Sequence, residues 1–322
     1  MKQKVFIMGE FPPELKEYIA RYCEAEYVEG GLNKELLFEK IKDASGMLIR
    51  PTIRVDEALL DAAPNLKVVS MRSVGYDCLN IPAMKARGIV GTHTPGVLDN
   101  SVADMALALM LAAGRRVTYC DRFIRQGKWA KGVPHSDLFS MDVYGKTLGI
   151  IGMGRIGQKV AKRAHLGFGM NILYYGRSTK PEAEQLYGAQ KVELDELCTR
   201  ADYIVVLISA SKETMKLVGE PQFALMKPTA VFVNVARGAV VDEAALIKAL
   251  KEGQIYAAGL DVFEKEPLPP DSELMKLENV VLQPHNASGT SETMEAVMKL
   301  AAENLVCALT GQPVPAIIPE FQ

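Results

Sequence analysis

Cysteine is scarce and scattered in this sequence. The 322 residues include five cysteines, and no two of them form a Cys-x-x-Cys pair; they are Cys23, Cys78, Cys120, Cys198 and Cys307. An odd number of widely spaced cysteines does not suit a disulfide framework or a thiolate metal site. We therefore predict reduced thiols and no bound metal.

The sequence also lacks an excess of charge of one sign and any long apolar run. Its formal net charge is -2, with acidic and basic residues interspersed along the whole length. This balance argues against a nucleic-acid or membrane-surface partner. No segment approaches the length of a membrane span, and the opening MKQKVFIMGEFPPE has too few apolar residues for a signal peptide. We expect a cytoplasmic protein.

What the sequence does contain is enough apolar material, 48% of its residues, for a large core, and a length that favours two domains. Short apolar runs alternate with longer amphipathic stretches, as in βαβ units with parallel sheets. The strand candidates are KVFIM, GMLIR, LKVVSM and GIVGTH in a first unit, then TLGIIG, NILYYG, YIVVLIS, AVFVNVA, YAAGLD and NVVLQPH in a second. Between the units we expect one long helix with Ser101 as its N-cap and Gly127 at its end. One further helix and a proline-rich tail follow Ser288.

A glycine triplet follows the first strand of the second unit and opens a helix. In GIIGMGRIGQKV, Gly152 allows a tight turn, Gly154 lets the backbone approach a pyrophosphate, and Gly157 lets helix and sheet pack closely. The amides of Arg155 and Ile156, at the start of that helix, would face the phosphates. The motif predicts a dinucleotide site, whereas a plain strand-to-helix turn is the structural alternative.

Three further groups of polar residues follow predicted strands. Arg237 comes after AVFVNVA, Asp261 and Glu266 come after YAAGL, and His285 comes after NVVLQP. Open α/β sheets bind ligands at the carboxyl ends of their strands. We therefore expect an arginine, a carboxylate and a histidine to converge on the crevice that holds the nicotinamide.

The stretches SVGYDCLN, TPGVLDNSVADMALALML, GKTLGIIGMGRIG, VNVARG, GLDVFEKEP and QPHNASGT carry a resemblance. The chain resembles the D-isomer-specific 2-hydroxyacid dehydrogenases over essentially its whole length, with glyoxylate and hydroxypyruvate reductases as the most similar group. The resemblance implies two Rossmann-like domains with parallel sheets. A dinucleotide-binding domain, residues 100–287, would be inserted into a smaller flavodoxin-like substrate domain, residues 1–99 and 288–322. It also implies a homodimer.

The same resemblance implies the roles of the site residues. His285 would donate a proton to the substrate oxygen as hydride reaches the keto carbon, and Glu266 would orient the imidazole and raise its pKa. Arg237 would polarise the keto oxygen and hold the carboxylate, together with the backbone amides of Val74 and Gly75. Asp261 would accept a hydrogen bond from the nicotinamide carboxamide, although an acid after a strand can simply cap the next turn.

Two departures from the family pattern lie on the substrate side. Asn80 replaces an aspartate, and His93 stands where asparagine is commoner, so the identity of the 2-keto acid stays open. His93, His135 and His165 otherwise suit ordinary structural positions.

The alternatives are a 3-phosphoglycerate dehydrogenase-like enzyme and a dinucleotide-sensing corepressor-like protein. No extra basic cluster for a substrate phosphate is evident in the sequence, which argues against the first. The absence of long disordered flanks argues against the second.

The coenzyme preference depends on the end of NILYYGRS. A carboxylate at this point would accept a hydrogen bond from the ribose 2′-hydroxyl of NAD(H) and repel the 2′-phosphate of NADP(H). Gly176 removes that repulsion here, and Arg177 and Ser178 form a phosphate-binding pair. The sequence therefore predicts a preference for NADP(H), with NAD(H) also possible.

Overall fold

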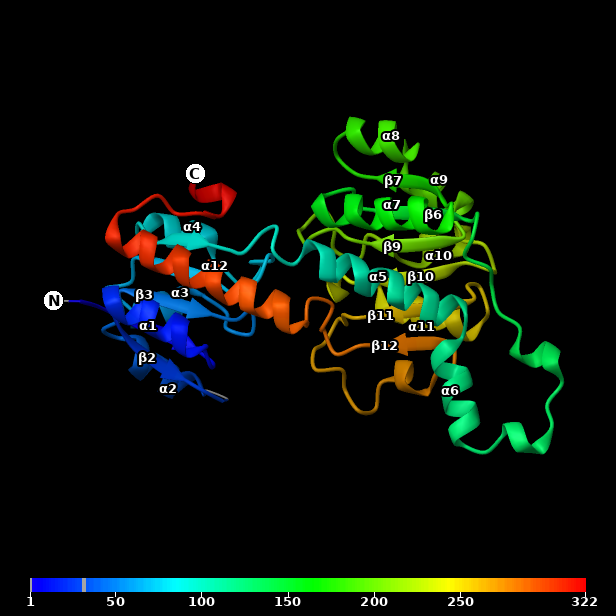
Figure 1. Cartoon of the computed structure of the whole chain (residues 1–322), viewed down its shortest axis with the longest axis horizontal. Helices are drawn as coiled ribbons and strands as arrows, with labels where there is room; N and C mark the ends of the chain where they lie inside the picture. The colour runs from blue at the N-terminus through cyan, green and yellow to red at the C-terminus, as the bar shows by residue number, and fades with distance from the viewer. Residues whose placement is uncertain (1, 31–32) are drawn as a thin grey trace. The chain divides into compact units, whose positions relative to one another are not determined.

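The computed structural model describes residues 2–30 and 33–322, apart from the side chains of Lys131, His135 and Asp137. The chain forms two compact units (Figure 1). Met1–Leu98 and Thr290–Gln322 form the first unit, and Asp99–Gly289 forms the second. Each unit contains one parallel sheet covered by helices, so the predicted α/β class with two parallel-sheet domains is confirmed.

The first unit has a five-stranded sheet in the order β2-β1-β3-β4-β5. This is the flavodoxin-like order. Its strands are β1 (Gln3–Met8), β2 (Cys23–Val28), β3 (Gly46–Ile49), β4 (Val68–Met71) and β5 (Val90–Thr92). Its helices are α1 (Pro13–Tyr22), α2 (Lys34–Ile41), α3 (Glu57–Ala62), α4 (Ile81–Ala86) and α12 (Ser291–Thr310), and a 3₁₀ turn, η5 (Pro319–Phe321), ends the chain.

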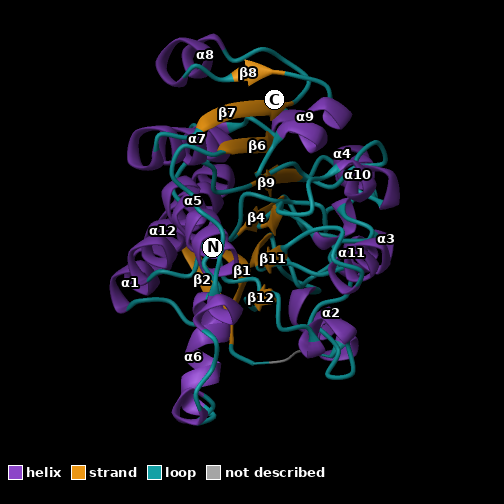
Figure 2. Cartoon of the chain, turned by 90° about the vertical axis from the view of Figure 1, so that its right-hand side faces the viewer, coloured by secondary structure: helices purple, strands orange, loops and turns teal. Residues whose placement is uncertain are grey.

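Helices cover both faces of this first sheet, which explains why its strands are apolar at nearly every position. Val5 and Ile7 of β1 pack against α1 and α12, whereas Phe6 packs among the residues of α2, α3 and α4. Figure 2 shows α1 and α12 on one side of the strands and α2, α3 and α4 on the other. The alternation follows the two-residue period of a strand. Strand β2 was not predicted, because CEAEYV lies at the sheet edge with only Cys23 fully buried and has no apolar run.

The second unit has a seven-stranded sheet in the order β12-β11-β10-β9-β6-β7-β8. Its strands are β6 (Thr147–Ile151), β7 (Asn171–Tyr175), β8 (Gln190–Lys191), β9 (Tyr203–Val206), β10 (Val231–Asn234), β11 (Ala257–Leu260) and β12 (Val280–Leu282). The strand order reverses between β6 and β9, where doubly wound sheets bind their ligands. The short edge strand β8 has only two exposed residues and was therefore also missed.

The helices of this unit are α5 (Asp99–Gly114), α6 (Val117–Arg125), α7 (Arg155–Phe168), α8 (Pro181–Tyr187), α9 (Leu194–Arg200), α10 (Glu220–Leu225) and α11 (Glu243–Lys251). Short 3₁₀ turns are η1 (Trp129–Lys131), η2 (His135–Leu138), η3 (Gly238–Val240) and η4 (Glu273–Lys276). Figure 2 shows α5 and α7 on one face of the sheet and α9, α10 and α11 on the other.

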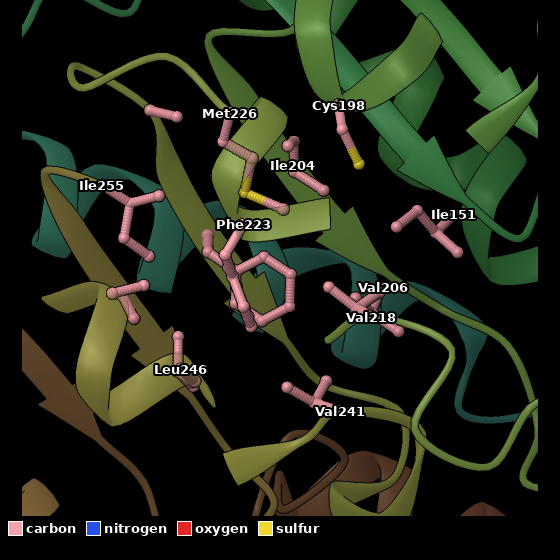
Figure 3. Packing of buried hydrophobic residues seen from close by; sticks show 14 of the residues in the cluster. Ile151, Cys198, Ile204, Val206, Val218, Phe223, Met226, Val241, Leu246 and Ile255 are labelled. Atoms are coloured by element: carbon pink, nitrogen blue, oxygen red, sulfur yellow. The ribbon is translucent and has the colours of Figure 1, made fainter. Parts of the chain in front are cut away.

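The core beneath α9, α10 and α11 is closely packed (Figure 3). Phe223 of α10 meets Phe232 of β10 edge to face, with ring centroids 5.3 Å apart, and Ile204 and Val206 of β9 lie in the same cluster. Both phenyl rings are fully buried. This packing fixes the strands whose carboxyl ends carry the polar residues described below.

The prediction of one long helix between the units is wrong. The segment forms two helices, α5 and α6, and α5 begins at Asp99 rather than after an N-cap at Ser101. Arg116 separates them with a φ of 52°, a left-handed conformation that cannot continue a right-handed helix. Gly114, the last residue of α5, is a local signal at this break, but a single glycine inside a helical pattern does not by itself end a helix.

In the part of the chain that the structure describes, no helix combines the length and the apolar character needed to cross a membrane.

Candidate active site

His285 lies in the loop after β12, on a backbone that its neighbours hold in an unusual conformation. Its φ is 53°, in the left-handed region, and its amide donates to the carbonyl oxygen of Asp261, 2.8 Å away. The buried Asp261 carboxylate accepts the next two amides, those of Asn286 at 2.7 Å and Ala287 at 2.9 Å. Asp261 therefore caps the turn that presents His285, in agreement with the alternative that an acid after a strand caps the next turn. Its contact with a nicotinamide carboxamide stays a prediction.

Glu266 fixes the imidazole of His285. One carboxylate oxygen lies 2.6 Å from Nδ1 of His285, and the other accepts the Phe263 amide at 3.0 Å. The two side chains remain 47% and 33% exposed, for His285 and Glu266 respectively. Because Nδ1 faces the carboxylate, Nε2 is the nitrogen left to serve a substrate oxygen.

The two pKa shifts of this pair reinforce each other. The hydrogen bond to Glu266 raises the pKa of His285 above its usual value, although burial and the charge of Arg237 oppose it. Burial would raise the pKa of Glu266, but the hydrogen bonds from His285 and the Phe263 amide outweigh burial and lower it. The pair therefore favours an imidazolium beside a carboxylate.

Arg237 stands at the carboxyl end of β10, on a turn that Asn234 organises. The buried Asn234 side chain donates to the Arg237 carbonyl at 2.9 Å and accepts the Ala236 amide at 3.0 Å. A Cβ built on the next residue, Gly238, would lie 1.9 Å from the Phe263 carbonyl carbon. Glycine is required there because the Arg237 loop packs directly against the loop that carries Glu266.

The glycine loop between β6 and α7 leaves room where a pyrophosphate would bind. A Cβ on Gly152 would lie 2.5 Å from Ile208, and one on Gly157 would lie 2.3 Å from the Gly152 carbonyl oxygen. A Cβ on Gly154, by contrast, would meet nothing within 4 Å. Packing thus explains the first and third glycines, whereas the exposed Gly154 faces open space.

The start of α7 suits an anion. Its N-cap, Gly154, supplies no side-chain acceptor, and its first turn contains no acidic residue. The first amides, which include those of Arg155 and Ile156, are therefore left for a phosphate. Arg155 is also held in place by Asp99, whose buried carboxylate lies 3.0 Å from its Nε. These residues fit a dinucleotide.

The proposed 2′-phosphate residues lie just beyond β7. Arg177 and Ser178 are exposed, and a Cβ on Gly176 would lie 3.9 Å from the Met153 amide, so this turn adjoins the glycine loop. The pKa of Glu213 is lowered, mainly by a hydrogen bond from Ser211 and least by the charge of Arg177.

In the first unit, Val74 and Gly75 form a turn with unused amides. Ser73 donates to the Gly75 carbonyl at 2.6 Å, and Nδ1 of His93 lies 3.0 Å from the Val74 carbonyl. Within residues 2–30 and 33–322, neither the Val74 nor the Gly75 amide donates a hydrogen bond. The turn therefore holds its carbonyls in place and leaves two donors for an anion.

Two supporting residues escaped the sequence analysis: Asn234 orients the Arg237 loop, and Asp99 holds Arg155. His93 has a structural position, as predicted, because it supports the Val74 turn. Only Asn234 has a local signal, since it is the polar end of the otherwise apolar strand VFVN. His165 has the structural position predicted for it, with Nδ1 3.1 Å from the Met170 carbonyl, whereas the side chain of His135 lies outside the described residues.

The geometry is that of a two-domain dinucleotide-dependent dehydrogenase, and comparison with known proteins assigns the family. Residues 107–287, more than half of the chain, match the NAD-binding domain of the D-isomer specific 2-hydroxyacid dehydrogenases. The chain belongs to this family.

Individual relatives match over nearly the full length. The chain is 45% identical to a glyoxylate reductase of Thermococcus litoralis, covering 99% of this chain and 97% of that protein. It is 42% identical to glyoxylate/hydroxypyruvate reductase B of Serratia proteamaculans, covering 97% and 96%. The NADPH-dependent glyoxylate/hydroxypyruvate reductase of Sinorhizobium meliloti, solved with NADP and malonate, has a TM-score of 0.86 at 31% identity, covering 100% and 98%.

Substitution of the middle glycine tests whether its open space belongs to the dinucleotide. Gly154→Ala should weaken NADPH and NADH binding at least about 10-fold, because the added methyl occupies the phosphate position, while the melting temperature stays within about 2 °C. Gly157→Ala should instead lower the melting temperature by more than about 4 °C, since its Cβ meets backbone. Titration calorimetry and thermal unfolding measure the two effects. Unchanged affinity in Gly154→Ala would contradict this assignment.

Proposed function

We propose that the protein reduces a small 2-keto acid of the glyoxylate or hydroxypyruvate kind to the D-2-hydroxy acid, with NADP(H) preferred over NAD(H). The observation that carries the proposal is the 2.6 Å contact between Glu266 and His285, with Arg237 close enough to influence the pKa of both. Full-length relatives named glyoxylate reductase support the substrate class.

The proton is supplied by His285. A reduced nicotinamide, when bound, would supply hydride to the keto carbon, and the carbonyl oxygen would then need a proton. The imidazolium of His285 gives this proton from Nε2, while Glu266 holds Nδ1 and stabilises the charged form. Glu266 is a positioning residue, because its two oxygens are engaged by His285 and Phe263 rather than directed to substrate.

Arg237 and the Val74–Gly75 turn bind the substrate's anionic end. A guanidinium fork matches the geometry of a carboxylate, and its charge also polarises the keto oxygen before hydride arrives. In the first unit, the unused amides of Val74 and Gly75 offer two further donors to a substrate carboxylate. His93, which stands where asparagine is commoner in the family, supports this turn through the Val74 carbonyl.

The NADP(H) preference rests on Arg177 and Ser178. Both are exposed beside the glycine loop, no carboxylate follows β7 directly, and Gly176 leaves room for a phosphate. The charge of Arg177 lowers the pKa of Glu213, but this interaction is the weakest of those that do so. The related reductase of Sinorhizobium meliloti is described as NADPH-dependent.

A homodimer is part of the proposal. Large apolar side chains are exposed along the segment from α6 to β6, and Figure 1 shows this segment extending away from the seven-stranded sheet. Trp129 is 65% exposed and Phe139 is 68% exposed, so Trp129 is not a core residue in the single chain. Exposed apolar segments of this kind mark association surfaces. The cytoplasmic location stays a prediction.

Removal of the proton donor tests the activity. With NADPH and glyoxylate or hydroxypyruvate, the wild-type protein should consume the coenzyme, and His285→Ala should lower turnover at least about 100-fold in both directions. Coenzyme affinity should change little. His165→Ala, which removes a histidine outside the site, serves as the control. Near-normal turnover in folded His285→Ala would remove His285 from the mechanism.

The pH profile tests the role of Glu266. Reduction requires the imidazolium, so activity should fall as pH rises through the raised pKa of His285. Glu266→Gln removes the main cause of that increase, and the alkaline fall should therefore move to lower pH. Glu264→Gln, an exposed neighbour, should leave the profile in place. An alkaline limb that does not move in Glu266→Gln would assign the proton to another group.

Coenzyme selectivity tests Arg177. The wild type should prefer NADPH by about 10- to 100-fold in kcat/KM, the range for one charge-assisted contact. Arg177→Ala should weaken NADPH selectively, whereas Arg200→Ala, an exposed arginine of α9, should not. Gly176→Asp combined with Arg177→Ala should turn the preference towards NADH. Equal wild-type kcat/KM with NADPH and NADH, measured at fixed ionic strength, would contradict the proposed preference without contradicting the reductase activity.

A further inference from the structure

The two residues that follow β5 contact the carbonyl groups of the Val74–Gly75 turn. The Thr94 amide donates to the Ser73 carbonyl at 2.9 Å, and Nδ1 of His93 lies 3.0 Å from the Val74 carbonyl. Because a carbonyl oxygen can only accept, Nδ1 carries the hydrogen of the second contact. The Ser73 hydroxyl closes the turn by donating to the Gly75 carbonyl at 2.6 Å.

These contacts fix the direction of the two unused amides. In a trans peptide, the carbonyl group and the N–H of the next residue lie in one plane and point in opposite directions. Thr94 holds the Ser73 carbonyl and thereby directs the Val74 N–H away from β5. His93 holds the Val74 carbonyl and directs the Gly75 N–H in the same manner. Both donors are therefore oriented from the side of the turn that faces β5.

The imidazole of His93 is itself confined. The residue is only 8% exposed, and the ring of Tyr76 meets the imidazole edge to face, with ring centroids 5.4 Å apart. The Tyr76 hydroxyl in turn donates to the Glu320 carboxylate at 3.2 Å. This packing keeps Nδ1 beside the Val74 carbonyl.

The backbone of His93 is fixed by α12 and by the segment that follows it. Asn304 of α12 is fully buried; its side chain donates to the His93 carbonyl at 2.9 Å and accepts the Ala316 amide at 2.9 Å. The His93 amide donates to the Ala316 carbonyl at 3.2 Å. All of these residues belong to the first unit, so the end of its chain supports the residue that orients the turn.

We infer that His93 is a positioning residue for the substrate carboxylate, because its hydrogen bond to the Val74 carbonyl directs the Gly75 N–H to that carboxylate. The carboxylate is bound in the substrate complex and in the transition state alike, so loss of this hydrogen bond should raise KM for the keto acid more than it lowers kcat. The inference rests on the proposed function, since it takes the Val74 and Gly75 amides to bind substrate.

A matched pair of substitutions separates the hydrogen bond from packing. Asparagine and leucine have nearly the same shape, and the amide nitrogen of asparagine stands the same number of bonds from Cβ as Nδ1 of histidine does. His93→Leu should raise KM for glyoxylate or hydroxypyruvate about 5- to 10-fold and change kcat less than about 2-fold. His93→Asn keeps a donor at the same place and should restore KM to within about 2-fold of the wild type.

Binding without turnover tests the same contact. Titration calorimetry of the full chain with NADPH present measures the affinity for oxamate, an unreactive analogue of a 2-keto acid. This affinity should fall about 5- to 10-fold in His93→Leu and recover in His93→Asn. NADPH affinity should be unchanged in both variants, and His165→Leu, in the second unit, is the matched control. If His93→Leu does not fold, His93→Ala takes its place, with the same expected loss.

The outcomes separate this inference from the proposed reaction. Unchanged KM and oxamate affinity in folded His93→Leu would overturn the role of His93 even in an active reductase. Equal losses in His93→Leu and His93→Asn would also overturn it, because packing rather than the donor would then explain the effect. A wild type that does not bind oxamate would contradict it as well. Loss in His93→Leu with recovery in His93→Asn would support it even if no keto acid is reduced, in which case the proposed reaction alone fails.

Discussion

Parallel pairing of the strands is the constraint on which the candidate site depends. In each sheet the paired strands run in the same direction, so their carboxyl ends meet at one edge. Residues that are distant in the sequence therefore become neighbours: Arg237, Glu266 and His285 at one sheet, and Arg50 and Arg72 at the other. The apolar strands, covered by helices on both faces, hold this edge rigid.

Close backbone approach then brings the loops to working distance. Gly238 packs against the Phe263 carbonyl so tightly that no side chain fits, and this contact joins the Arg237 loop to the loop that carries Glu266. Asp261 fixes the loop that carries His285, because its carboxylate caps the turn that follows β12. The arrangement of His285 and Glu266 thus depends on a buried carboxylate, that of Asp261, and on the close packing at Gly238.

Much of this arrangement could be predicted from the sequence, because strand ends and glycine spacing are local signals. The glycine loop and the polar residues after β10, β11 and β12 could be predicted because each of them follows an apolar run that forms a strand. The break between α5 and α6 was missed because the single Gly114 at the end of α5 is a weak signal within a helical pattern, and the left-handed conformation of Arg116 has no signal in the sequence. Strands β2 and β8 were missed because exposed edge strands need few apolar residues.

Charge shows most clearly why composition is an incomplete guide. A net charge of -2, with acidic and basic residues interspersed, argues against polyanions as partners. Small anions respond to a different quantity, the local balance within a few ångströms. Arg50 and Arg72 show no basic run in the sequence, yet the fold places both beside Gly9 without an acid between them. A chain of nearly balanced net charge can therefore place two cations side by side at the carboxyl ends of its strands. The local charge at that edge, rather than the net charge of the chain, determines how it interacts with small anions.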